Sequence, residues 1–180
     1  MSGTAAPEGL TGLFEAHGTP VASGSNAPLL LEDPGSAWLV TEGKLDVFAV
    51  RVVGDRPEGP RNHLFSVAAG EMALGVEPAW ADDVGLLAVG IPGTTARRLA
   101  VEQLEARISD ASVRAALERY VLAFSSALSR RSSPRFDVLL SPGEAVSVSQ
   151  GAALATRRGV VWVQVESGAL EFDGQESLPV

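Results

Sequence analysis

The sequence predicts a mainly β fold with helices, built as a β-roll that is followed by a helical segment and a second, partial β module. Two observations lead to this fold class. Short apolar segments separated by Gly and Pro fill residues 18–92 and return over 134–180, a pattern typical of short strands. Between them, residues 93–133 carry apolar side chains at helical spacing. We therefore expect an α+β chain with β modules on either side of helices.

The first 17 residues precede the strand patterns and are mostly small and polar. We expect residues 1–17 to form a tail with one short helix, in which Leu10, Leu13 and Phe14 are the apolar anchors. The segment has neither the basic nor the apolar region of a signal peptide.

Composition narrows the classes of function. The chain of 180 residues carries a formal net charge of −8, with 22 acidic and 14 basic side chains. This balance argues against nucleic acid as a partner and against binding to anionic lipid. The chain has no cysteine, and its two histidines, His17 and His63, exclude a histidine-rich metal site. The apolar runs are far shorter than the roughly 20 residues of a membrane span, so we expect a soluble segment without direct membrane insertion.

Four segments of the predicted β-roll are typical of strands. They are SAWLV, KLDVFAVRVV, HLFSVAA and GLLAVGI. The second segment alternates, which places Leu45, Val47 and Ala49 on one face of its strand. The polar stretch Gly54–Asn62 separates the second segment from the third and predicts a hairpin with a long tip.

The helical pattern begins after the breaker Pro92-Gly93. We expect one or two helices from about 95 to 130, with Thr94 or Thr95 as the first cap. Ser109–Ser112 predicts an interruption and a second cap. Before it, Val101, Leu104 and Ile108 fall at helical spacing. After it, one apolar stripe consists of Val113, Leu117, Tyr120, Val121, Phe124 and Leu128. This stripe either packs against its own domain or offers a surface to a partner helix.

Residues 143–172 repeat the pattern of residues 18–48. Gly18, Val21, Ala27, Leu29, Gly43 and Leu45 recur as Gly143, Val146, Ala152, Leu154, Gly168 and Leu170, and Trp38 matches Trp162 within one residue. The repeat predicts two related β modules, or two halves of one double-stranded roll. The second copy lacks the strands that follow in the first. Either the chain is a fragment of a longer protein, or the second copy donates strands to the first.

The stretch GEMAL, Gly70–Leu74, has the residue types of a ribose site. Its glycine allows close approach of the backbone, and the carboxylate of Glu71 can accept from a ribose hydroxyl. A cyclic phosphate beside it would need an arginine. The sequence has no arginine from residue 62 to 96 and places Asp82 and Asp83 there instead.

The order GKLDVFAV, hairpin, GEMALG is similar to the cyclic-nucleotide-binding domain family, whose fold is a cupin-like or jelly-roll β-roll flanked by helices. Gly70, Glu71, Ala73 and Leu74 match the first half of the family's cassette. Pro78–Asp82 departs from its second half, Pro-Arg-Ala. The resemblance implies Gly70, Glu71 and Ala73 as ligand-binding candidates in a degenerate nucleotide pocket.

Segments along nearly the whole chain resemble a second family. LFEAHGTP, VTEGKLDVFAV, RNHLFSVAAGEMALGV and GVVWVQVESGALEFDGQESLP look like the N-terminal region of ABC transporter permease/ATPase subunits that export NHLP-type (nitrile-hydratase-leader-type) peptides, or bacteriocins. This resemblance implies a non-catalytic regulatory or substrate-recognition domain on the cytoplasmic face of a bacterial membrane. The implied partners are the membrane and ATPase domains of the same transporter, a peptide substrate or leader, and a partner subunit. A dimer is compatible with it.

The same resemblance implies no enzyme activity and no cofactor for this chain, because ATP would bind only in the ATPase domain of the longer protein. Two arginine pairs, Arg97-Arg98 and Arg130-Arg131, bracket the helical segment. They are candidates for contact with an acidic partner, and solvated helix ends are the alternative.

The sequence is also compatible with three other functions. They are a genuine small-ligand sensor of the cyclic-nucleotide type, a stand-alone scaffold or interaction protein, and a small cupin-type enzyme. The enzyme is disfavoured because cupin metal sites need several histidines with a carboxylate. The missing arginine favours the degenerate pocket over the sensor. We therefore expect no measurable binding of cyclic AMP or cyclic GMP.

Overall fold

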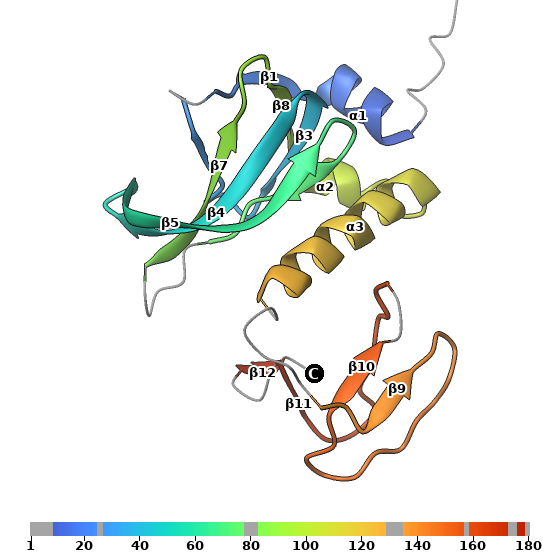
Figure 1. Cartoon of the computed structure of the whole chain (residues 1–180). Helices are drawn as coiled ribbons and strands as arrows, with labels where there is room; N and C mark the ends of the chain where they lie inside the picture. Colours follow the sequence, from blue (N-terminus) through green and yellow to red (C-terminus); the bar gives the residue numbers. More distant parts are fainter. Residues whose placement is uncertain are drawn as a thin grey trace, which may run out of the picture. The chain divides into compact units, whose positions relative to one another are not determined.

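The computed structural model describes residues 9–24, 27–77, 83–128, 135–156, 159–172 and 176–178 (Figure 1). The chain divides into two compact units, Met1–Phe124 and Ser125–Val180, which we call the first and second unit. The domain boundary expected at residue 133 lies outside the described residues. None of the described helices is long and apolar enough to cross a membrane.

The residues of the first unit that the structure describes form two four-stranded antiparallel sheets. Sheet A has the order β1-β8-β3-β6, and the second sheet, sheet C, has the order β2-β7-β4-β5. The strands of sheet A are β1 (Thr19–Ala22), β3 (Ser36–Glu42), β6 (Met72–Leu74) and β8 (Thr95–Ala100). Those of sheet C are β2 (Leu29–Leu30), β4 (Lys44–Val53), β5 (Arg56–Ala68) and β7 (Val84–Gly90). The predicted fold class, mainly β with helices in a β-roll, is confirmed.

The hairpin between β4 and β5 is tighter than the sequence predicts. Only Gly54 and Asp55 form the turn, and their φ angles are 54° and 62°. Two consecutive positive φ values describe the tight hairpin turn whose twist matches that of the flanking strands. The prediction of a long tip over Gly54–Asn62 is therefore wrong, because Arg56 already pairs with Val53.

Strand β4 does not keep one buried face along its length. Leu45 and Val47 are fully buried, as the alternation predicts, but Ala49 is only half-buried. The register against β5 shifts at Val47/Phe48 and between residues 49 and 51. Such bulges move the following side chains to the other face. Val50 and Val52 are consequently the buried residues of the distal half.

The beginning of the predicted helical segment is a strand. Residues 95–100 form β8 at the centre of sheet A, and the first helix after them is α2 (Val101–Glu105). Thr94 does not cap a helix. Its hydroxyl donates to the carbonyl of Lys44 at 2.9 Å and accepts from the Lys44 N–H at 3.2 Å. Both partners lie at the start of β4, so Thr94 joins the two sheets.

Helix α3 (Ala111–Leu128) begins where the sequence predicts a second cap. The carboxylate of Asp110 accepts from the N–H and the hydroxyl of Ser112, at 2.8 and 2.9 Å. The hydrogen bonds from Ser112 lower the pKa of Asp110, which keeps the capping oxygen charged. The buried residues of α3 include Val113 and Tyr120 from the predicted stripe, whereas Leu128 is exposed.

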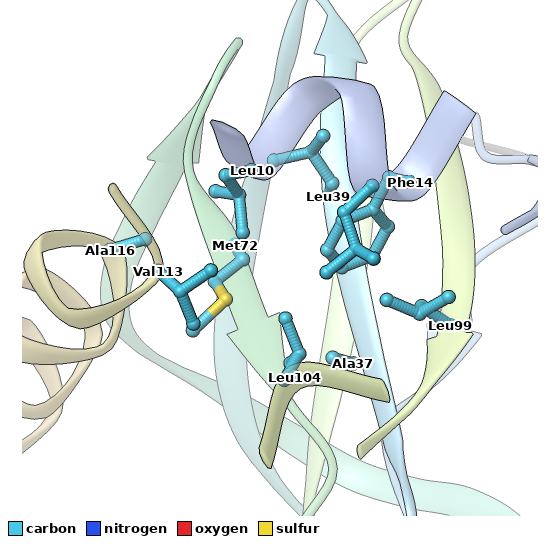
Figure 2. Packing of buried hydrophobic residues seen from close by; sticks show 10 residues of the cluster. Leu10, Phe14, Ala37, Leu39, Met72, Leu99, Leu104, Val113 and Ala116 are labelled. Carbon is cyan, nitrogen blue, oxygen red and sulfur yellow. The ribbon is translucent and has the colours of Figure 1, made fainter. Parts of the chain in front are cut away.

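A cluster of buried hydrophobic residues lies between sheet A and three helices (Figure 2). Helix α1 (Gly9–His17) contributes the three anchors that the sequence predicts, Leu10, Leu13 and Phe14, all buried. The other members are Ala37, Leu39, Met72, Leu99, Leu104, Val113 and Ala116. The stripe of α3 thus packs against its own unit, which is the first of the two alternatives above.

The described residues of the second unit form two pairs of short strands. β9 (Val138–Leu140) pairs with β10 (Leu154–Thr156) in parallel, and β11 (Leu170–Phe172) pairs with β12 (Glu176–Leu178) antiparallel. The predicted repeat of the first unit is reproduced only in part. β10 and β11 fall on the counterparts of β2 and β4. The counterpart of β3 is not a strand, and the indole of Trp162 is 64% exposed.

Candidate functional site

The Gly70–Glu71 turn connects β5 to β6 and is bound on both sides to β3. The N–H of Gly70 donates to the carbonyl of Val40 at 2.8 Å, and the N–H of Val40 donates to the carbonyl of Glu71 at 3.0 Å. Gly70 has a φ of 83°, a conformation that favours glycine. The Glu71 carboxylate accepts from the N–H of Ala68 at 2.9 Å. One carboxylate oxygen of Glu71, which the sequence predicts to bind a ribose, therefore already accepts a hydrogen bond within its own turn.

Ala73, the third ligand candidate, is fully buried in β6. It stands opposite Trp38 of β3, and Trp38 stands opposite Arg98 of β8. Residues opposite one another in a sheet share a face, so the three side chains form one row. Trp38 is only 5% exposed and its ring packs against Gly75, where an added Cβ would lie 3.1 Å away. The indole fills the space beside Ala73.

A hollow of about 100 Å³ lies where α3 meets the Gly70–Glu71 turn. The β-roll contributes Phe65, Ser66, Val67, Glu71 and Met72, and α3 contributes Ala116, Arg119, Tyr120 and Ala123. Arg119 is exposed and makes no hydrogen bond or ion pair with a described residue. The hollow therefore has an aromatic wall, one engaged carboxylate and one available guanidinium.

Aromatic side chains seat α3 on strand β5. The ring of Phe65 meets those of Tyr120 and Phe124 edge-on at 5.9 and 6.1 Å, and the last two stack at 5.9 Å. The Tyr120 hydroxyl donates to the carbonyl of Leu74 at 3.2 Å. Burial raises the pKa of Tyr120 to about 12, against the opposing effect of this hydrogen bond. The phenol therefore stays a neutral donor that links α3 to β6.

Arg97 has a structural role that the sequence does not reveal. Its Nε donates to the carbonyl of Phe14 at 2.7 Å, and its Nη2 donates to those of Glu15 and Gly18 at 3.2 and 2.7 Å. These carbonyls lie at the C-terminal end of α1, where backbone acceptors lack intrahelical donors. Arg97 therefore caps that helix, and its contact with an acidic partner stays a prediction.

Arg98 is paired within the first unit. Its guanidinium binds the carboxylate of Asp33, donates to the hydroxyl of Ser36 at 2.7 Å, and lies 5.6 Å from the ring centroid of Trp38. Arg97 and Arg98 thus lie in a strand and not at a helix end, because residues 95–100 pair with β1 and β3. Arg130 and Arg131 lie outside the described residues.

The predicted site residues are brought together in part. Gly70, Glu71 and Ala73 lie on one turn and the strand after it, and Arg98 lies two strands away in the row of Ala73. The residue that sequence reasoning missed is Arg119, a cation facing the hollow beside Glu71. Its neighbour Tyr120 belongs to the predicted apolar stripe. The stripe predicted a helix here, but it did not predict which strands the helix packs against. Asp82 lies outside the described residues.

The known proteins that this chain resembles are solved structures. No family model and no curated protein matches the chain. The heme domain of CooA from Rhodospirillum rubrum is 18% identical, with a TM-score of 0.45, over 66% of this chain and 82% of that one. Oxidized CprK in complex with o-chlorophenolacetic acid is 14% identical, with a TM-score of 0.45, over 66% and 48%. A CRP/FNR-family regulator from Eubacterium rectale is 13% identical, with a TM-score of 0.44, over 64% and 54%.

The chain covers only about half of the length of the CprK and Eubacterium rectale proteins. The third of these neighbours is described as a member of the CRP/FNR family.

Proposed function

We propose that residues 9–124 form a non-catalytic small-ligand sensor domain whose output element is helix α3. The observation that carries the proposal is the hollow between α3 and the Gly70–Glu71 turn. One part of its wall belongs to the β-roll and the other to the helix. A molecule in the hollow contacts both, so its binding free energy depends on where α3 lies.

The lining favours a small organic anion with an apolar body. Arg119 supplies a guanidinium that can hold a carboxylate through two parallel hydrogen bonds. Phe65 and Tyr120 supply an aromatic wall for the apolar part. The volume of about 100 Å³ is well below the roughly 300–1,000 Å³ of ordinary small-molecule sites. A ligand of a few heavy atoms fits with α3 in place, and a larger one requires α3 to move.

Cyclic nucleotides are a poor match for this site. They are too large for the hollow as it stands, Trp38 fills the space beside Ala73, and the Gly70–Glu71 turn brings no arginine of its own. We expect no measurable heat of binding for cyclic AMP or cyclic GMP in isothermal titration calorimetry. Micromolar binding of either would contradict the degenerate-pocket interpretation.

The sensor proposal is tested by hydrogen exchange of the whole chain with acetate, butyrate and benzoate as probes. Sodium chloride at the same ionic strength is the reference. At least one probe should change amide exchange within residues 111–124, because its binding and the position of α3 are coupled. The change should vanish in Arg119→Gln and persist in Glu118→Gln, an exposed neighbour outside the hollow. No change in the wild type, or an equal change in Arg119→Gln, would refute the proposal.

The finer assignment, a regulatory domain of an NHLP-type peptide exporter, rests on the sequence segments quoted above. It predicts that the gene continues beyond Val180 into apolar membrane spans and a phosphate-binding loop of the ATPase type. Reading the coding sequence downstream tests this directly. A downstream DNA-binding helix-turn-helix, or a stop codon, would replace the exporter with a regulator or a stand-alone sensor.

A further inference from the structure

A second hollow, of about 520 Å³, lies in the first unit away from α3. Four segments meet there: the junction of α1 and β1, the turn before β3, the end of β8 and the start of α2. It shares no lining residue with the α3 hollow. Its volume is within the usual range of small-molecule sites. Its charged side chains are Asp33, Arg98 and Glu102, together with the imidazole of His17.

Arg98 is held in one orientation in this hollow. Nε donates to the hydroxyl of Ser36, Nη2 binds the carboxylate of Asp33, and Cζ lies over the ring of Trp38, 5.6 Å from its centroid. Nη1 makes no hydrogen bond with a described residue, and the side chain is 47% exposed. A guanidinium fixed on one edge and open on the other loses little further freedom when a ligand binds.

Glu102 is the complementary group. It lies in the first turn of α2, is exposed, and its carboxylate has no partner among the described residues. Asp33 differs from it, because it already accepts from Ser36, from the Gly35 N–H and from Arg98. The hydrogen bonds from Ser36 and Gly35 and the nearby Arg98 lower the pKa of Asp33, so its charge stays matched to Arg98. The hollow thus has one open cationic edge and one open carboxylate.

We propose that this hollow binds a small zwitterion of the α-amino-acid class, with its carboxylate on Nη1 of Arg98 and its ammonium on Glu102. A simple anion would meet two carboxylates against one guanidinium, which disfavours it. A simple amine would leave the open edge of Arg98 unused. Only a ligand that carries both charges satisfies both groups, and the volume leaves room for its side chain.

The test is calorimetric titration of the full chain, at neutral pH, with each of the twenty common α-amino acids. At least one should bind saturably. Glu102→Gln should weaken that binding by at least about tenfold, the loss expected for one charge-assisted contact. Glu105→Gln should leave it unchanged, because Glu105 is exposed on the same helix but does not line the hollow. Both variants alter exposed side chains, so the fold is retained.

Two analogues of the best ligand test its two ends. The amine that lacks the carboxylate and the N-acetylated amino acid should each bind at least about tenfold more weakly. The proposal is overturned if no amino acid binds, if Glu102→Gln binds as well as the wild type, or if either analogue matches the parent. Arg119→Gln should bind the amino acid normally, which separates this site from the sensor site at α3.

Discussion

The two units of this chain carry similar sequence patterns but differ in what they bury. The first unit has two antiparallel sheets and three helices, and its buried residues include Phe14, Leu39 and Trp38. In the second unit, none of the described residues from 135 to 171 is buried, and Trp162 stands 64% exposed. Trp38 and Trp162 are matched by the repeat. Equal patterning therefore does not give equal packing, because burial needs a second element on the same face.

The largest difference is expected at the matched tryptophans. Trp38→Ala should lower the free energy of unfolding by about 3–5 kcal/mol, because it leaves a large cavity beside Ala73. Trp162→Ala should change it by less than about 0.5 kcal/mol. Urea denaturation followed by far-UV circular dichroism measures both. Equal losses would mean that the second unit has a packed core of its own.

A matched glycine pair gives the next largest effect. Gly43 and Gly168 both have positive φ, 75° and 99°. A Cβ on Gly43 would also lie 2.6 Å from the hydroxyl of Thr94 and 2.9 Å from its Cα, whereas a Cβ on Gly168 meets open space. Gly168→Ala should cost about 1–2 kcal/mol from the backbone alone, and Gly43→Ala more than that. Urea midpoints check the order, and a reversed order would contradict the close approach of the two sheets.

The arginine cap of α1 is expected to give a smaller effect. Arg97→Met removes three charge-assisted hydrogen bonds to carbonyls at the end of that helix and should cost about 1.5–3 kcal/mol. Arg135→Met, at an exposed position of the second unit, should cost less than about 0.5 kcal/mol. Hydrogen exchange of residues 9–17 should rise only in Arg97→Met. An unchanged helix would show that Arg97 is dispensable as a cap.

The smallest effect on stability is expected at Asp33, a residue of the first unit whose side chain is exposed, like many side chains of the second unit. The folded chain holds the pKa of Asp33 below its ordinary value of 3.8, mainly through Ser36 and Gly35. The stabilisation by the charged carboxylate is therefore present above pH 3.8 and is lost as the pH falls through the lower folded-state value. Asp33→Asn should thus differ from the wild type at pH 7 and converge with it in acid. A constant difference down to pH 2.5, in urea denaturation, would contradict this.

Local sequence was sufficient to predict those elements whose structure depends on residues close to them in the chain. The anchors of α1, the strands SAWLV and KLDVFAVRVV, and the recapping at Asp110 all follow from short-range patterns. The segment 95–100 was mispredicted as helix because TARRLA has no strand alternation of its own. Its strand form comes from pairing with β1 and β3, both more than 50 residues away in sequence.

The candidate sites divide in the same way. The GEMAL turn was visible because glycine with positive φ and a following glutamate leave a short-range signature. Arg119 and Glu102 could not be identified from the sequence, because each lines its hollow together with residues from distant segments of the chain. Sequence by itself determined the mainly β fold, the acidic charge and the position of the turn, since these depend on composition and local spacing. Only the tertiary structure decided that Trp38 is buried and that Arg97 caps the C-terminal end of α1. It also decided that Nε and Nη2 of Arg98 are hydrogen-bonded, whereas Nη1 makes no hydrogen bond with a described residue. Each of those depends on long-range pairing of strands, which no local pattern encodes.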